Sequence, residues 1–306
     1  MQSDGIRIGT RGSALALAQA EETRRALTAG LSIGGDVIAI QPIRTTGDKI
    51  TDRPIAAAGG KGLFTKEIDE ALLDGRVDIG VHSAKDMATR LPDGIVIAAC
   101  LPREDVRDAF VSPLARTLFE LPKGAVLGTS SLRRKAMALR LRPDLTVVDL
   151  RGNVDTRLRK ISEGEAQATL LAAAGLARLG LSNRAASFLD IETWLPAAGQ
   201  AAIAITARTE DLAMRQRLAA IDHRATSIAL AAERAFLAVL DGSCRTPIGA
   251  HARLDGDRLR FSGIIIKPDG SVAHEVARDG AIADAEAVGA DAGADLARRG
   301  GRDFFG

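Results

Sequence analysis

Residues 6–30 read IRIGTRGSALALAQAEETRRALTAG, a short strand pattern followed by a long helical one. Residues 6–10 form a β-branched run, and residues 14–29 show the spacing of a helix. The turn between them ends at Ser13, whose hydroxyl suits the N-cap position of the helix. A strand, a turn and a helix in this order predict the start of an α/β fold.

The same alternation continues into a first α/β unit. Strands are expected at 37–43, 77–81 and 95–101, and a helix at 61–73. Strand–helix–strand order implies a mostly parallel sheet flanked by helices. The pattern then resets at 101–108, through a proline and a charged stretch that we interpret as a hinge.

A second α/β unit follows this hinge. Its expected strands are 126–128, 146–150 and 168–171, and its expected helices are 131–141, 154–161 and 173–179. A second linker lies at 195–200, and the strand expected at 201–207 could rejoin the first unit. Two similar units predict a two-lobed protein with a cleft between the lobes.

The C-terminal third reads differently. An amphipathic helix at 226–240 precedes three strands that alternate like an antiparallel sheet, with a turn at Asp255-Gly256, and a closing helix at 281–299. We therefore expect a small α+β domain. The expected division is 1–101 with 201–220 for the first lobe, 106–196 for the second and 224–306 for the C-terminal domain.

Composition excludes several classes of protein. The 41 basic and 39 acidic residues nearly balance, which argues against a nucleic-acid-binding or membrane-surface protein. Neither a signal peptide nor an apolar run long enough to span a bilayer is visible. Two distant cysteines form no disulfide framework, and the four histidines lack metal-ligand spacing. We expect a cytoplasmic protein without a metal.

One cysteine lies in an unusual loop, DGSCRTPIGA at residues 241–250. Gly242 and Pro247 indicate a turning backbone from which Cys244 can project, and the neighbouring cation Arg245 favours the thiolate. A free cysteine is more often a small buried apolar residue. The polar, glycine-rich loop favours a nucleophilic role for Cys244 instead.

Cations and hydroxyls recur where strands end and helices begin. In a doubly wound sheet these turns lie at the carboxyl ends of strands, where ligands bind and helix N-termini attract anions. Any one such arginine would ordinarily be a solvated surface charge. Phosphate-binding loop patterns are absent from the sequence, so a ligand with several separated carboxylates fits better. The positions are Arg11 with Ser13, Lys61, Ser83 with Lys85, Thr129 and Ser131 with Arg133 and Arg134, Arg151 with Arg157, and Gly175 with Arg178.

Asp86 is a carboxylate beside Lys85 at one of these strand ends. It could be a salt-bridge partner that orders the cations. Alternatively, it could stabilise a positive charge that develops during a reaction. The sequence pattern leaves both readings open.

Six motifs together resemble the hydroxymethylbilane synthases, also called porphobilinogen deaminases, nearly from end to end. They are IGTRGSALAL (8–17), GGKGLFTKE (59–67), VHSAKD (81–86), GTSSLRR (128–134), LRGNVDTR (150–157) and GSCRTPIG (242–249). The resemblance implies two lobes similar to bacterial two-lobed binding proteins, plus a third domain. It also implies a dipyrromethane cofactor joined to Cys244 by a thioether. The implied reaction condenses four porphobilinogens head-to-tail, with loss of ammonia, into hydroxymethylbilane for haem and related pathways; hydrolysis releases this product.

The resemblance assigns roles to individual residues of this chain. Asp86 becomes the catalytic carboxylate, which binds pyrrole N–H groups and counters the cationic azafulvene; whether it also passes a proton to the leaving amine stays open. Cofactor-binding residues are Cys244, Ser83, Lys85, Thr129, Ser131, Arg133, Arg134, Arg151 and Gly175. Substrate-binding residues are Arg11, Ser13, Lys61, Phe64, Arg157, Arg178 and Gln200. Porphobilinogen and the growing polypyrrole are the expected partners, and a monomer is expected.

Three positions depart from the family pattern, namely Ala88, Gln167 and Ala201. None removes a charged or covalent site residue, so we expect changes in loop shape, hinge behaviour or stability. The alternative to the enzyme is a non-enzymatic, two-lobed carboxylate-binding protein. The cysteine-bearing third domain and Asp86 among cations favour the enzyme.

Overall fold

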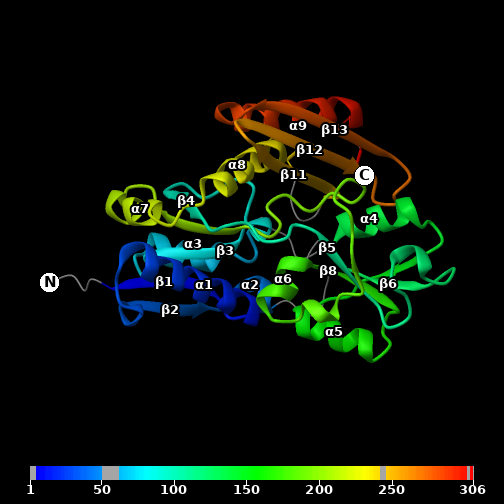
Figure 1. The fold of residues 1–306 in the computed structure, drawn as a ribbon, viewed down its shortest axis with the longest axis horizontal. Coiled ribbons are helices and arrows are strands. Elements are labelled where there is room, and N and C mark those ends of the chain that lie inside the picture. Colours follow the sequence, from blue (N-terminus) through cyan, green and yellow to red (C-terminus); the bar gives the residue numbers. More distant parts are fainter. Residues whose placement is uncertain (1–4, 50–61, 242–245, 302–303, 306) are drawn as a thin grey trace.

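The computed structural model describes residues 5–49, 62–241, 246–301 and 304–305, and these residues form three sheets (Figure 1). Two five-stranded mixed sheets lie side by side, and a three-stranded sheet lies above them. The predicted fold class, two α/β lobes and a smaller C-terminal α+β domain, is confirmed. Within the described part of the chain, no helix has the length and apolar character needed to cross a membrane.

The first lobe is built on a sheet with the order β2-β1-β3-β10-β4. Its strands are β1 (Ile6–Arg11), β2 (Ile38–Ile43), β3 (Ile79–Ser83), β4 (Ile95–Cys100) and β10 (Ile203–Arg208). Strands β1, β2 and β3 are parallel, whereas β10 runs antiparallel between β3 and β4. The predicted return of the chain to this lobe is therefore confirmed. The helices are α1 (Ala14–Leu31), α2 (Thr46–Lys49), α3 (Lys66–Leu73) and α7 (Leu212–Ala219).

The second lobe repeats this plan with the order β7-β6-β8-β5-β9. Its strands are β5 (Asp108–Val111), β6 (Val126–Gly128), β7 (Thr146–Val148), β8 (Ala168–Ala172) and β9 (Ser187–Phe188). Helices α4 (Leu132–Leu141), α5 (Val154–Ser162) and α6 (Ala173–Arg178) complete it. Strand β5 is antiparallel to β8 and begins at Asp108, the residue at which the expected hinge was taken to end.

The antiparallel strands β5 and β10 occupy equivalent places in the two sheets. Each is the fourth strand in its order, and each directly follows a crossing of the chain from one lobe to the other. The expected hinges thus lead straight into sheet strands. Each lobe is completed by a segment that arrives from its neighbour.

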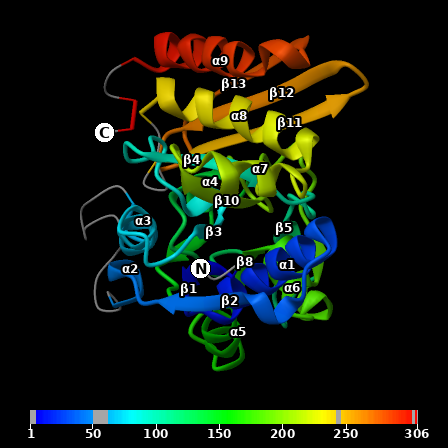
Figure 2. The ribbon, with the colours of Figure 1, turned by 90° about the vertical axis from the view of Figure 1, so that its left-hand side faces the viewer.

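The C-terminal domain contains an antiparallel sheet and two long helices (Figure 2). The elements are α8 (Arg224–Val239), β11 (Ile248–Asp255), β12 (Arg258–Ile266), β13 (Ala273–Ala281) and α9 (Ala285–Gly300). The predicted turn between the first two strands is present, with Gly256 at a φ of 62°. Helices α8 and α9 pack so closely that a Cβ on Gly289 would lie 2.0 Å from the carbonyl oxygen of Ala232.

This domain contacts both lobes. Ile264 and Ile266 of β12 share a buried cluster with Phe110 and Trp194 of the second lobe. On the other side, Leu230 of α8 packs with Ala84 and other buried residues of the first lobe. The C-terminal domain therefore lies across the line where the chain passes between the lobes.

Some element boundaries differ from expectation. The helix expected from residue 61 begins at Lys66, because Gly62, at a φ of 80°, and the residues up to Thr65 form a turn. The final helix begins at Ala285 after a short 3-10 helix. The 3-10 helices are η1 (Gly35–Val37), η3 (Ala84–Asp86), η4 (Leu118–Glu120), η5 (Ser182–Arg184) and η6 (Ile282–Asp284).

Candidate functional site

A pocket lies at the carboxyl ends of β1 and β3 in the first lobe. Its empty volume, with open solvent included, is about 390 Å³. Five of the residues proposed from sequence line it, namely Arg11, Ser13, Phe64, Ser83 and Asp86. The strands place these side chains together because parallel strands end at the same edge of the sheet.

Arg11 is held in place on two sides. It forms an ion pair with Asp48 of α2, and its guanidinium carbon lies 4.2 Å from the centroid of the Phe64 ring. A guanidinium over an aromatic ring is stabilised by the ring quadrupole. No local sequence pattern identifies Asp48 as the partner of Arg11.

The pocket also contains Gln19, which sequence reasoning did not identify. Its side chain is buried and exchanges hydrogen bonds with the hydroxyl of Ser83, at 2.9 and 3.0 Å. Gln19 lies on the same face of α1 as Ala16, three residues earlier, which also lines the pocket. The helical spacing between these residues is the signal that could have found it.

The hydroxyl side chains of Ser13 and Ser131 cap helix N-termini. Ser13 accepts a hydrogen bond from the N–H of Ala16 at 3.3 Å, which confirms the predicted N-cap of α1. Ser131 does the same for α4, accepting from the N–H of Arg134 at 3.4 Å. The Thr129 hydroxyl in turn accepts from the N–H of Ser131. In both lobes, a capped helix N-terminus follows a strand at the site.

Lys85 and Asp86 lie together in η3, directly after β3. The Lys85 ammonium donates to the Oε1 of Gln200 at 3.3 Å. Burial lowers the pKa of Lys85 to about 8; Asp86 opposes this shift, while Arg134 adds to it. Lys85 therefore lies within electrostatic range of a cation from the other lobe.

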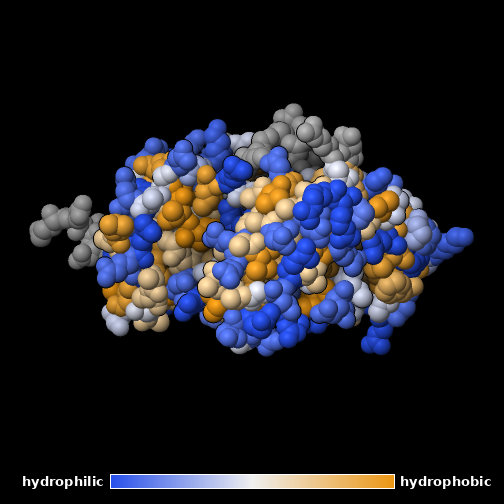
Figure 3. Space-filling view, turned by 90° about the horizontal axis from the view of Figure 1, so that it is seen from above, coloured by the Kyte–Doolittle hydropathy of each residue, from blue (hydrophilic) through white to orange (hydrophobic). Residues whose placement is uncertain are grey.

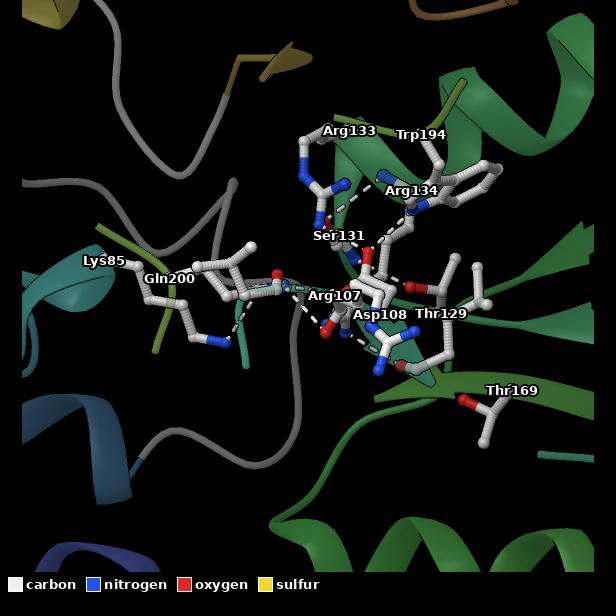
Figure 4. A network of polar contacts seen from close by, with 12 residues as sticks. Lys85, Arg107, Asp108, Thr129, Ser131, Arg133, Arg134, Thr169, Trp194 and Gln200 are labelled. Carbon is white, nitrogen blue, oxygen red and sulfur yellow. Dashed lines mark hydrogen bonds and ion pairs between the residues drawn. The ribbon is translucent and has the colours of Figure 1, made fainter. Parts of the chain in front are cut away.

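The centre of the polar network is Asp108 on β5, which the sequence analysis had not singled out (Figure 4). This fully buried carboxylate accepts hydrogen bonds from Arg133 and Arg134 at 2.7 Å each, from the Trp194 indole at 2.8 Å and from Gln200 at 2.9 Å. Burial alone would raise the pKa of Asp108, but the two guanidinium groups hold it well below its usual range.

Arg133 and Arg134 are consequently buried and largely committed to protein partners. Besides Asp108, Arg133 donates to the carbonyl of Leu195, and Arg134 to that of Leu170. The Nε atoms of both arginines are buried without a partner among the described residues. These two Nε–H groups are therefore buried donors whose hydrogen-bonding capacity is unused within the described part of the chain.

Arg151 lies in the turn before α5, and Arg157 lies in the first turn of that helix. Arg157 donates to the carbonyl of Gly152 at 2.8 Å. Burial lowers the pKa of Arg157 to about 10; Arg134 and Arg151 act in the same direction, whereas Asp86 opposes them. Positive charge from the second lobe thus faces Asp86 of the first.

The two remaining predicted residues of the second lobe lie on α6, against α1. A Cβ on Gly175 would lie 3.6 Å from the Leu15 side chain, so the helices are in contact at this point. Arg178 donates from Nε to Glu22 of α1 at 3.0 Å and from Nη2 to the carbonyl of Ala201 at 3.1 Å. Both hydrogen-bond partners lie outside the second lobe.

Cys244 and Lys61 lie outside the described residues, so the structure adds nothing to their sequence assignments. The other cysteine, Cys100, is fully buried at the end of β4, and burial raises its thiol pKa to about 11. A thiol of that kind is inert at neutral pH.

Comparison with known proteins gives a consistent answer over the whole chain. A family model described as "Porphobilinogen deaminase, dipyromethane cofactor binding domain" matches residues 6–216, and "Porphobilinogen deaminase, C-terminal domain" matches residues 227–298. A porphobilinogen deaminase from Nitrobacter hamburgensis is 57% identical over 310 residues, covering 100% of this chain and 98% of the relative. The chain belongs to the porphobilinogen deaminase family.

A second family member, from Nitrobacter winogradskyi, is 59% identical over 298 residues, covering 97% of this chain and 94% of the relative. Among solved structures, a periplasmic substrate-binding protein of an ABC transporter from Coxiella burnetii is 17% identical. It has a TM-score of 0.44, covering 71% of this chain and 91% of that one.

The residues described here fit the porphobilinogen deaminase cofactor. Each pyrrole ring of a dipyrromethane carries two carboxylates, and the site brings together cations from both lobes. Burial lowers the pKa values of Lys85 and Arg157, and two buried arginine N–H groups lack partners within the described residues. Within the same described residues, no group of three His, Cys, Asp or Glu side chains could hold a metal ion.

The three positions that depart from the family pattern all lie among the described residues. Ala201 has a φ of 71°, in the left-handed region that favours glycine, and its carbonyl accepts from Arg178. The Gln167 side chain accepts from the N–H of Val126, and the Ala88 carbonyl accepts from Arg234. Each of the three lies in an ordered hydrogen-bonded segment.

Proposed function

We propose that this chain condenses four porphobilinogen molecules head-to-tail, with loss of ammonia, on a dipyrromethane covalently attached to Cys244. Hydrolysis then releases the linear hydroxymethylbilane. One observation carries the proposal: Asp86 lines the pocket, and its charge acts on Lys85 of its own lobe and on Arg157 of the other lobe. Family membership supports the reaction, and the position of Asp86 in the pocket supports the role proposed for it.

The cations bind carboxylates. Arg11, supported by the Phe64 ring, would hold a carboxylate of the incoming pyrrole, and Lys85, supported by Gln200, would hold a carboxylate of the cofactor. Charge-assisted hydrogen bonds to carboxylates are shorter and stronger than neutral ones. The remaining proposed anion-binding residues are Ser13, Lys61, Ser83, Thr129, Ser131, Arg133, Arg134, Arg151, Arg157 and Arg178, with Gly175 at the contact between α1 and α6.

Asp86 provides the opposite charge. When bound, the dipyrromethane supplies a terminal ring whose free carbon forms the new bond. The Asp86 carboxylate, on the short helix at the end of β3, can accept pyrrole N–H groups and stabilise the positive charge that develops as the amine leaves porphobilinogen.

The same proposal divides the chain into 1–101 with 201–220, 106–196 and 224–306. The three sheets support this division, since β10 completes the first sheet and β5 begins the second lobe. We further propose that the protein acts in the cytoplasm as a monomer. Two cysteines far apart in sequence fit a reducing compartment.

Intact mass tests the proposal most directly. Protein purified after expression should be heavier than its sequence by a dipyrromethane, and Cys244→Ala should return the bare sequence mass with almost no activity. Cys100→Ala is the matched control, since this buried thiol should not carry the cofactor. A cofactor mass that persists in Cys244→Ala would refute the anchor. A bare wild-type mass with reversible porphobilinogen binding would favour the carboxylate-binding protein.

A further inference from the structure

One ion pair connects the two lobes beside the pocket. Arg178, the last residue of α6, donates to Glu22 of α1 at 3.0 Å and to the carbonyl of Ala201 at 3.1 Å. Its side chain is only 8% exposed, whereas that of Glu22 is 33% exposed. The arginine is therefore enclosed, and the carboxylate remains in contact with water.

Glu22 lies close to the pocket along α1. Gln19, which lines the pocket, is three residues earlier, so the two side chains lie on the same face of the helix, about one turn apart. The contact between Gly175 and Leu15 lies on the same pair of helices. The ion pair is thus placed where α6 meets the helix that forms one wall of the pocket.

A carboxylate ligand and Glu22 would compete for the same guanidinium. An enclosed arginine is costly to leave without a charged partner, so Glu22 can depart only when another anion replaces it. The departing Glu22 carboxylate loses little, because a third of its side chain already contacts solvent. Exchange of one carboxylate for another at Arg178 is therefore chemically feasible.

We propose that Glu22 is a positioning residue that holds Arg178 and, with it, α6 against α1, until a pyrrole carboxylate displaces it. This inference rests on the proposed function, in which Arg178 binds the substrate or the growing chain. In this proposal, Glu22 itself contacts neither the substrate nor the growing chain. It sets how readily Arg178 becomes available, and so affects substrate affinity more than the chemical step.

The test compares Glu22→Gln with Glu21→Gln, using porphobilinogen as the probe and cofactor-loaded full-length enzyme. Glu21 is the adjacent residue on α1, and its ion pair is with Arg24 of the same helix. Removing the competing charge at Glu22 should lower the KM roughly two- to fivefold, the range expected for a partly exposed pair, and change kcat by less than about twofold. Glu21→Gln should leave the KM unchanged.

Two further variants separate competition from a structural effect. Glu22→Asp retains the charge and should restore a KM close to that of the wild type. In an Arg178→Gln background, which itself should raise the KM, adding Glu22→Gln should change nothing further. An unchanged or raised KM in folded Glu22→Gln would refute the proposal, as would loss of folding in that variant. A wild-type protein without ring addition would instead refute the proposed function.

Discussion

Asp86 lies close to cations from both lobes, and its proposed role depends on its negative charge. Asp86→Asn keeps the size of the side chain and most of its hydrogen bonding, but it removes that charge. We expect the variant to fold and, once given preassembled cofactor, to extend it about a hundred- to a thousandfold more slowly. Single-turnover ring addition on variants with mass-confirmed loading measures this.

Asp86→Glu serves as the comparison, because it returns the charge at a displaced position. It should recover part of the lost rate. Near-normal extension by loaded Asp86→Asn would return Asp86 to the role of a salt-bridge partner for Lys85.

The charge of Lys85 should set a pH limit on carboxylate binding. Burial lowers its pKa from 10.5 to about 8, so the group is a cation below pH 8 and increasingly neutral above it. The hold of this group on a cofactor carboxylate should therefore weaken as the pH rises above about 8, and ring addition should slow. In Lys85→Arg, the side chain stays charged, and this slowing should disappear. The rate of ring addition measured from pH 7 to 9.5 for both cofactor-loaded proteins checks the prediction.

The same shift has the opposite consequence for stability. Between pH 8 and 10.5 the unfolded state binds a proton at Lys85 that the folded state does not, so this group makes the free energy of unfolding rise with pH. Urea unfolding without ligand should show that rise, and Lys85→Met should lack it.

Asp108 offers a test of stability rather than chemistry. Asp108→Asn would leave two buried guanidinium groups without their counter-charge, which should cost about 3–5 kcal/mol in the free energy of unfolding. Asp105→Asn is the control, because its ion pair with Arg107 is largely exposed and should contribute less than about 1 kcal/mol. Denaturant titration distinguishes them; similar losses would mean that Asp108 does not organise the network.

Which residues gather at strand ends could be predicted from sequence, but which of them pair could not. Arg11, Ser13, Ser83 and Asp86 follow strands and do line one pocket. The charged partners Asp48, Asp108 and Glu22 lie on separate elements, and no local pattern joins them to their arginines. Pairing of this kind depends on how sheets and helices pack, which periodicity does not encode.

At the scale of elements, long periodic segments were predictable and short irregular ones were not. Helix α1 begins where its serine cap indicated, and α4 begins one residue after its expected start. Strand β5 was missed because its four residues follow a charged stretch, and helix α7 because its apolar residues do not gather on one face. Both are determined largely by contacts with neighbouring elements.

Gly199 couples the second linker to the short helix that carries Asp86. It has a φ of 73°, and a Cβ there would lie 3.0 Å from the backbone of Ala84 and Lys85. Gly199→Ala should therefore displace η3, cost at least about 2 kcal/mol in the free energy of unfolding, and slow ring addition.

Gly180→Ala is the matched control for this substitution. Gly180 has a φ of 69°, but a Cβ there would meet nothing within 4 Å. It should cost only the left-handed conformation, about 1–2 kcal/mol, and leave the rate intact. Equal rates in the two variants would show that the linker does not position η3.

For the molecule as a whole, ring addition requires the lobes to accommodate a lengthening product. The linkers are tied to the C-terminal domain, since Glu233 of α8 accepts from Arg103 and from the N–H of Gly199. Any parting of the lobes must therefore involve that domain. The face seen from above mixes hydrophilic and apolar residues (Figure 3).

A crosslink between the lobes tests this movement. Cysteines placed at the exposed positions Arg25 on α1 and Ala177 on α6, joined by a bifunctional maleimide, should stall the series of mass steps early without preventing the first addition. Each protein with only one of the two introduced cysteines, treated with the same reagent, is the control. Full-length product from a verified crosslinked protein would show that the cavity already holds the whole chain.

The return of the chain to the first lobe at β10 has a consequence for synthesis on the ribosome. Strand β10 separates β3 from β4, so the N-terminal sheet lacks its fourth strand until residues 203–208 have been made. A nascent chain of about 190 residues would thus present two unpaired edges, the condition under which β-structure aggregates. The first lobe cannot mature before the second has been translated. Protection of the growing chain by a chaperone should matter most in that interval.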